Sequence, residues 1–169
     1  MPKELTIFAA SDLIYITVAL AAVALAALLW RRPRRSALRW AVAAVIVLVL
    51  SLVFSRIGGA IYNDPRPFTT SHVPPLIAHA PDNGFPSDHA LLAAAIVALM
   101  LLADPFSAVP FAVLAVLIDW ARVGAGLHHV GDVAGSSLMV AAALLIAVAV
   151  APWLAAAITP RVPAAWLRD

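Results

Sequence analysis

The sequence has no cysteine and few charged residues. Without cysteine the chain has no disulfide, no thiolate metal site and no cysteine nucleophile. Only 12% of its 169 residues are charged, whereas a soluble domain carries roughly 25%. The net charge of +2 gives no support for nucleic-acid binding. Because 64% of the residues are hydrophobic, the composition predicts an all-α protein, a polytopic helical bundle in the membrane that forms one domain over residues 1–169.

Five apolar segments are expected to span the membrane, since about 20 helical residues cross a hydrocarbon core of roughly 30 Å. They cover residues 7–30, 40–62, 88–103, 106–121 and 133–151. The arginine-rich stretch 31–39 follows the first segment, which argues against a cleaved signal peptide. Cytoplasmic loops collect arginine and lysine. We therefore expect the N-terminus outside, and the tail that begins at Pro152 and carries Arg161 and Arg168 inside.

The stretch from Ala121 to Asp132 gathers polar groups between two apolar segments. Arg122 is followed by five residues and His128, and three more residues separate His128 from Asp132. A cation for an anion, an imidazole and a carboxylate that orients it are components of a phosphoryl-transfer site. This spacing alone also occurs by chance, so two further stretches decide its meaning.

Those two stretches lie upstream, on the same expected side of the membrane. Ser87 follows Pro86 and is expected to cap the helix at residue 88, whose free N–H groups attract anions. Arg66 stands between two prolines, and a stiffly held guanidinium suits phosphate. Taken singly, these residues also fit a capped helix with an interfacial His89 and an arginine that binds lipid headgroups.

Together the three stretches resemble the type 2 phosphatidic acid phosphatase superfamily, whose pattern is K-x6-R-P, then P-S-G-H, then S-R-x5-H-x3-D. Arg66-Pro67, Pro86-Ser87-Asp88-His89 and Arg122…His128…Asp132 match in order and in placement relative to the spans. Three positions depart from this pattern. They are Gly59 for the lysine, Asp88 for the glycine and Ala121 for the serine.

Within this superfamily the chain is most similar to the bacitracin-resistance type of undecaprenyl-diphosphatases. The resemblance rests on Asn-Asp-Pro-Arg-Pro-Phe, on residues 76–82 and on Phe-Pro-Ser-Asp-His. That branch also tends to lack the lysine and to carry aspartate in the second motif. Arg56 is expected to snorkel to the interface rather than to replace the lysine.

The resemblance implies a role for each matching residue. His128 is the nucleophile that becomes phosphohistidine, and Asp132 orients its ring. His89 protonates the leaving group and then activates water. Asp88 is expected beside the phosphate, where it either tunes His89 or contacts a second phosphate. The implied substrate-binding residues are Arg66, Ser87, Asp88 and Arg122.

The resemblance implies no metal and no other cofactor. A zinc site needs tighter clustering or a helical i, i+4 pair, and the adjacent His128 and His129 point different ways on a helix. His72, His79 and His129 are expected to line the loop or the interface. His79 belongs with Asp82 to the branch-like stretch, so these two are the candidates for a further role.

The implied activity is hydrolysis of undecaprenyl diphosphate to undecaprenyl phosphate, a lipid carrier for cell-wall polymers, at the outer face of a bacterial plasma membrane. The same chemistry on phosphatidic acid or phosphatidylglycerol phosphate is the near alternative. A transporter or haem-binding protein would need ionisable groups deep in the spans. Asp119 is the only acidic residue well inside the later spans, and it is expected to pair with Arg122.

Overall fold

The computed structural model describes residues 2–71 and 73–159, and these form helices and connecting loops without a β-strand. Four helices are long and apolar enough to cross a membrane, and a shorter apolar helix, α5, lies among them. His72, Arg161 and Arg168 fall outside the described residues. The helices are α1 (Lys3–Ser11), α2 (Leu13–Trp30), α3 (Arg34–Ile61), α4 (Pro67–Ser71), α5 (Asp88–Ala103), α6 (Pro105–Gly124) and α7 (Val130–Ile158). The all-α membrane bundle predicted from composition is confirmed.

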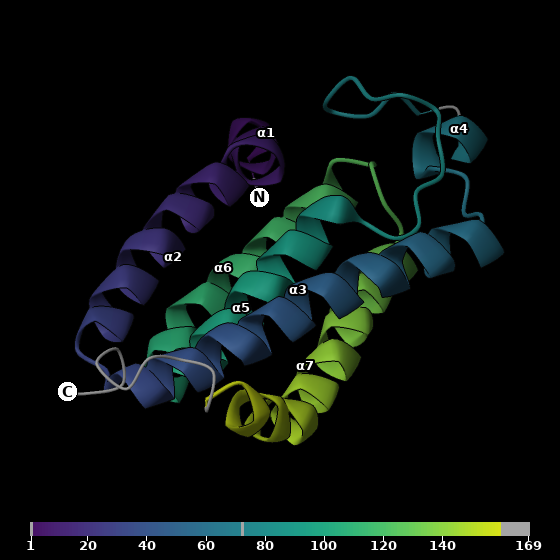
Figure 1. Cartoon of the computed structure of the whole chain (residues 1–169). Coiled ribbons are helices and arrows are strands. Elements are labelled where there is room, and N and C mark those ends of the chain that lie inside the picture. Colours follow the sequence, from purple (N-terminus) through teal and green to yellow (C-terminus); the bar gives the residue numbers. More distant parts are fainter. Residues whose placement is uncertain (1, 72, 160–169) are drawn as a thin grey trace.

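Helix α5 is the centre of the bundle and packs against α2, α3, α6 and α7 (Figure 1). Half of its residues are buried, most of them alanine, so that neighbouring helices approach closely. The helix begins and ends as the sequence predicts. Ser87 caps it by accepting a hydrogen bond from the N–H of Ala90 at 3.5 Å, and Asp104 ends it and caps α6 through the N–H of Ser107 at 2.7 Å.

The first expected span, residues 7–30, is wrong as a single helix. The chain breaks at Asp12 into α1 and α2. The Ser11 hydroxyl lies 2.8 Å from the carbonyl oxygen of Ile7 and 2.6 Å from the Asp12 carboxylate, and a local side-chain bond to either acceptor competes with helix continuation. Helix α1 then packs against α6 at the end of the bundle where the polar loops gather (Figure 1).

The last span is longer than expected. Helix α7 continues through Pro152 to Ile158, so the prediction that the span stops at residue 151 is wrong. Proline removes one backbone hydrogen bond, but it kinks a helix rather than ending it when apolar packing continues beyond. Ala155 is buried, and α7 changes direction near its C-terminal end (Figure 1).

The polar loop between α3 and α5 is held by one asparagine and one phenylalanine. The Asn83 side chain accepts from the N–H groups of Asp64 and Phe85 and donates to two carbonyls at the end of α3. The Phe85 ring fills the space beside Gly58 and Gly135, where added Cβ atoms would lie 3.2 Å and 2.4 Å from it. These contacts fix the loop against α3 and α7 just before α5 begins.

Candidate active site

His128 lies in the connection between α6 and α7 and is 2% exposed. Its Nδ1 is 2.9 Å from the carbonyl oxygen of Gly84, and its Nε2 is 3.2 Å from a guanidinium nitrogen of both Arg66 and Arg122. A carbonyl only accepts and a guanidinium only donates. The partners therefore assign the proton to Nδ1 and leave the lone pair of Nε2 directed at two cations.

Both arginines are buried and held by backbone carbonyls. Arg66, 6% exposed, donates from Nη1 to the carbonyl of Leu127 at 2.9 Å and from Nε to Asp82 at 2.6 Å. Arg122, 4% exposed, donates from Nη1 to the carbonyl of Ala10 at 3.1 Å, and its Nε has no protein partner. Two fixed cations at one ring nitrogen form a site for an anion such as a phosphoryl group.

The pKa of His128 is lowered to about 3, first by burial and then by the charges of Arg122 and Arg66. The imidazole is therefore neutral at neutral pH, as a nucleophile must be. The hydrogen bond from Arg66 holds the pKa of Asp82 below its usual range. Asp82 therefore stays ionised and keeps the Arg66 guanidinium oriented.

Asp132 lies behind the His128 ring. Its Oδ2 is 3.4 Å from Nδ1, so the nearest acceptor for the Nδ1 proton is Gly84, which the sequence analysis missed. Asp132 is fully buried, accepts from the backbone N–H of His129 at 2.8 Å, and leaves Oδ1 without a protein partner. It thus fixes the start of α7 and places a carboxyl group beside the ring.

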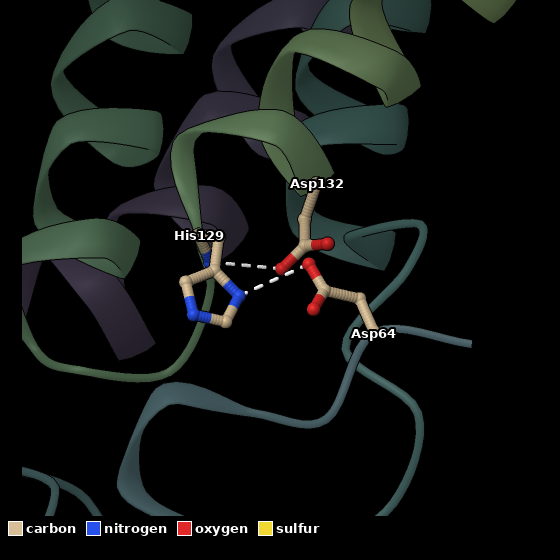
Figure 2. Close-up of side chains that lie close together, drawn as sticks. All are labelled: Asp64, His129 and Asp132. Atoms are coloured by element: carbon tan, nitrogen blue, oxygen red, sulfur yellow. Dashed lines mark hydrogen bonds and ion pairs between the residues drawn. The ribbon is translucent and has the colours of Figure 1, made fainter. Parts of the chain in front are cut away.

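Asp64, His129 and Asp132 meet at this point (Figure 2), with possible ligand atoms within 4.8 Å of one another. Nδ1 of His129 is 3.0 Å from Oδ2 of Asp64, and the two carboxylates face each other. Among residues 2–71 and 73–159, these three form the group that could hold a cation. The sequence spacing concealed them because Asp64 is 65 residues from His129.

The remaining predicted residues surround the start of α5. Ser87 is fully buried as the cap, and His89 is half-buried on the first turn, where the charges of Arg122 and Asp88 act on it. Asp88 is exposed and lines a cavity of 310 Å³ together with Arg56. Arg56 therefore lies where it could contact a ligand bound beside Asp88, although the Arg56 side chain is exposed.

The expected pair of Asp119 with Arg122 is wrong. Arg122 turns toward α1 and His128 instead, and Oδ1 of Asp119 is buried without a hydrogen-bond partner. The reason lies in the break at Asp12, which brings the carbonyl of Ala10 over the end of α6. Asp119 is instead surrounded by apolar side chains of α6 and α7, among them Val116 and Val133.

Carbonyl groups are the main functional contacts that sequence reasoning missed. Ala10, Gly84 and Leu127 contribute through their backbone, so their side-chain types carry no direct signal. The identity of Gly84 as a glycine is an indirect signal in the sequence. A Cβ there would lie 3.0 Å from the carbonyl oxygen of Asp64 and 3.1 Å from Oδ2 of Asp132, so only glycine fits without displacement.

The PAP2 superfamily matches residues 40–156, which contain the three motifs. The chain belongs to the PAP2 superfamily. No solved structure matches it.

Three curated relatives are similar to the chain. "Undecaprenyl-diphosphatase BcrC" of Bacillus subtilis is 35% identical over 122 residues, which cover 72% of this chain and 62% of the relative. "Bacitracin transport permease protein BcrC" of Bacillus licheniformis is 35% identical over 57% of this chain and 48% of the relative. "Putative undecaprenyl-diphosphatase YbjG" of Escherichia coli is 32% identical over 80% and 66%. The chain thus spans between about half and two thirds of these relatives.

Proposed function

We propose that this chain is a membrane phosphatase that hydrolyses undecaprenyl diphosphate to undecaprenyl phosphate and inorganic phosphate. The observation that carries the proposal is the position of Nε2 of His128, 3.2 Å from both Arg66 and Arg122. An unprotonated nitrogen between two fixed cations suits attack on a phosphoryl group. The substrate is taken from the printed names of two relatives and fits the apolar helices around the site.

The reaction begins with in-line attack by Nε2 of His128 on the terminal phosphorus. A nitrogen–phosphorus bond forms, and the bond from phosphorus to the bridging oxygen breaks. His89 donates a proton to that oxygen, which leaves on undecaprenyl phosphate. His89 then takes a proton from water, the water oxygen attacks the phosphohistidine, and inorganic phosphate leaves with the ring neutral again.

The surrounding groups stabilise charge in both steps. Arg66 and Arg122 bind the non-bridging oxygens, which carry the charge that develops in the transition state. The N-terminus of α5, capped by Ser87, offers free N–H groups to the same phosphate. As the His128 ring gains positive charge, its Nδ1 proton is held by Gly84, with the Asp132 carboxylate 3.4 Å away.

The site is proposed to face the outer side of a bacterial plasma membrane. The support is the arginine-rich turn between α2 and α3, which lies at the opposite end of the bundle from the polar loops (Figure 1). A cysteine at Thr70 should react with an impermeant reagent in intact cells, and a cysteine at Ser36 should react only after permeabilisation. The reverse pattern would refute the orientation.

Phosphoenzyme trapping tests the mechanism. Purified protein given undecaprenyl diphosphate labelled in the terminal phosphate should form an acid-labile, base-stable phosphoenzyme. His128→Ala should abolish turnover and label. His89→Ala should cripple turnover but still accept phosphate from a substrate with a good leaving group. Label that persists in His128→Ala and is lost in His89→Ala would reverse the roles.

A substrate panel tests the activity itself. Phosphate release should be fastest from undecaprenyl diphosphate and slower from phosphatidic acid and phosphatidylglycerol phosphate. A preference for either glycerolipid would keep the chemistry and change the substrate. Release from none of them would refute the proposed function.

A further inference from the structure

Asp64 and His129 form a direct side-chain contact between the Arg66 segment and the start of α7. Oδ2 of Asp64 is 3.0 Å from Nδ1 of His129. The Asp64 side chain is 20% exposed and that of His129 is 44% exposed. Figure 2 shows the imidazole turned toward the Asp64 carboxylate, with the Asp132 carboxylate next to that of Asp64. The reaction described above uses neither member of this pair.

The Asp64 end of the pair is tied to both sides of the His128 ring. Asp64 lies two residues before Arg66, whose Nη1 is 3.2 Å from Nε2 of His128. The Asp64 carbonyl accepts from the N–H of Gly84 at 2.8 Å, and the Gly84 carbonyl in turn holds Nδ1 of His128. Movement of Asp64 would therefore shift a donor at one ring nitrogen and the acceptor at the other.

The His129 end is tied to the nucleophile and its carboxylate. His129 directly follows His128, and its backbone N–H donates to Oδ2 of Asp132 at 2.8 Å. Its ring then reaches across to Asp64. The carboxylates of Asp64 and Asp132 face each other beside this ring (Figure 2). The pair thus closes a ring of contacts around His128.

We infer that Asp64 and His129 are a positioning pair that keeps Arg66 and Gly84 in register with His128. Both residues act through others, because the contacts with Nε2 come from Arg66 and Arg122. The inference rests on the proposed function. Misplacement of a reacting geometry by about 1 Å costs on the order of a hundredfold in rate, so loss of the pair should lower kcat more than it raises KM.

A double-mutant cycle with Asp64→Ala, His129→Ala and the double variant tests the pair. Each single variant should lower kcat about tenfold or more, with a smaller change in KM, and the double variant should be no worse than about threefold beyond either. His129→Asn, which retains a donor near the position of Nδ1, should recover most of the rate. The pairing would be overturned if the kcat loss of the double variant equalled the product of the two single losses. It would also be overturned if His129→Asn lost as much kcat as His129→Ala.

Val130→Ala is the matched control, because Val130 follows His129 and is 67% exposed; it should keep the wild-type kcat. Thermal melting in detergent checks that each variant is folded. If the wild-type protein is active and both Asp64→Ala and His129→Ala keep its kcat, the positioning pair alone is refuted. If the wild-type protein itself is inactive, the proposed function is refuted.

The same residues could bind a divalent cation, so manganese binding is measured by electron paramagnetic resonance. No specific binding is expected, and chelator should leave kcat unchanged. Tight binding that Asp64→Ala abolishes, with a chelator-sensitive rate, would overturn the direct contact in favour of a metal site.

Discussion

The two ends of the helical bundle both carry arginines, but they hold them in opposite ways. At the end with the polar loops, Arg66 and Arg122 are almost fully buried and fixed by carbonyls and a carboxylate. At the other end, Arg31, Arg35 and Arg39 are exposed in the turn and first helical residues after α2. Both sets occur in a chain with few charges.

The difference separates two functions of positive charge. A buried guanidinium is costly unless its donors are satisfied, so it is retained where its position matters. An exposed arginine at a membrane surface costs little and biases orientation. We therefore expect substitutions at the two ends to differ in kinetics by orders of magnitude.

The largest effect is expected for the buried arginines. Arg66→Ala or Arg122→Ala should lower kcat/KM about a hundredfold or more, because each removes a charged donor to the transition state. Arg35→Ala, at the opposite end, should keep the rate within about twofold, as is usual for exposed charges. Phosphate-release assays on purified variants measure both. Equal losses at the two ends would remove the distinction.

A smaller loss is expected from crowding the loop that holds Nδ1. Gly84→Ala adds a Cβ 3.0 Å from the Asp64 carbonyl oxygen and 3.1 Å from Asp132. The loop must shift, and kcat should fall about tenfold or more. Gly131→Ala is the control, since a Cβ there meets nothing within 4 Å. The comparison fails if both variants keep the wild-type rate.

The buried imidazole should also make stability depend on pH. His128 has a pKa near 3 when folded and about 6.5 when unfolded. Between these values the unfolded chain binds more protons. The contribution of the neutral His128 ring to the free energy of unfolding is therefore complete above pH 6.5. It is lost as pH falls, by up to about 1.4 kcal/mol per pH unit. The melting temperature of the wild-type protein should fall more between pH 7 and pH 4.5 than the melting temperature of His128→Gln. Equal falls in melting temperature for the two proteins would contradict the lowered pKa of His128.

Among the residues around the site, the smallest effect is expected at Arg56, which is exposed. If it replaced the family's lysine, Arg56→Ala would match Arg66→Ala. We expect instead a loss of about threefold or less, because exposed charges contribute little to fixed geometry. A hundredfold loss would move Arg56 into the phosphate site and give the cavity shared with Asp88 a direct role in binding substrate.

Local patterns were sufficient for α5 and its cap. Apolar length predicted the bounds of residues 88–103, and the serine after Pro86 predicted the start. They failed where packing overrides a local rule. Pro152 does not end α7, and an apolar run with one Ser-Asp step breaks into α1 and α2.

The sequence by itself determined the class of the protein and the residues that we propose carry its chemistry. Composition required a membrane bundle, and the spacing of Arg66, Ser87-Asp88-His89, Arg122, His128 and Asp132 identified the family. Spacing works here because each motif covers a short stretch of chain, so that its members stay close to one another in space.

Only the tertiary structure decided how those residues are held. The carbonyls of Ala10, Gly84 and Leu127 that fix Arg122, His128 and Arg66 come from three separate segments. Asp64 meets His129 across 65 positions of sequence. A backbone carbonyl is the same group in every residue, and a long-range contact forms only when packing brings the segments together. No pattern of side chains along the chain could specify either.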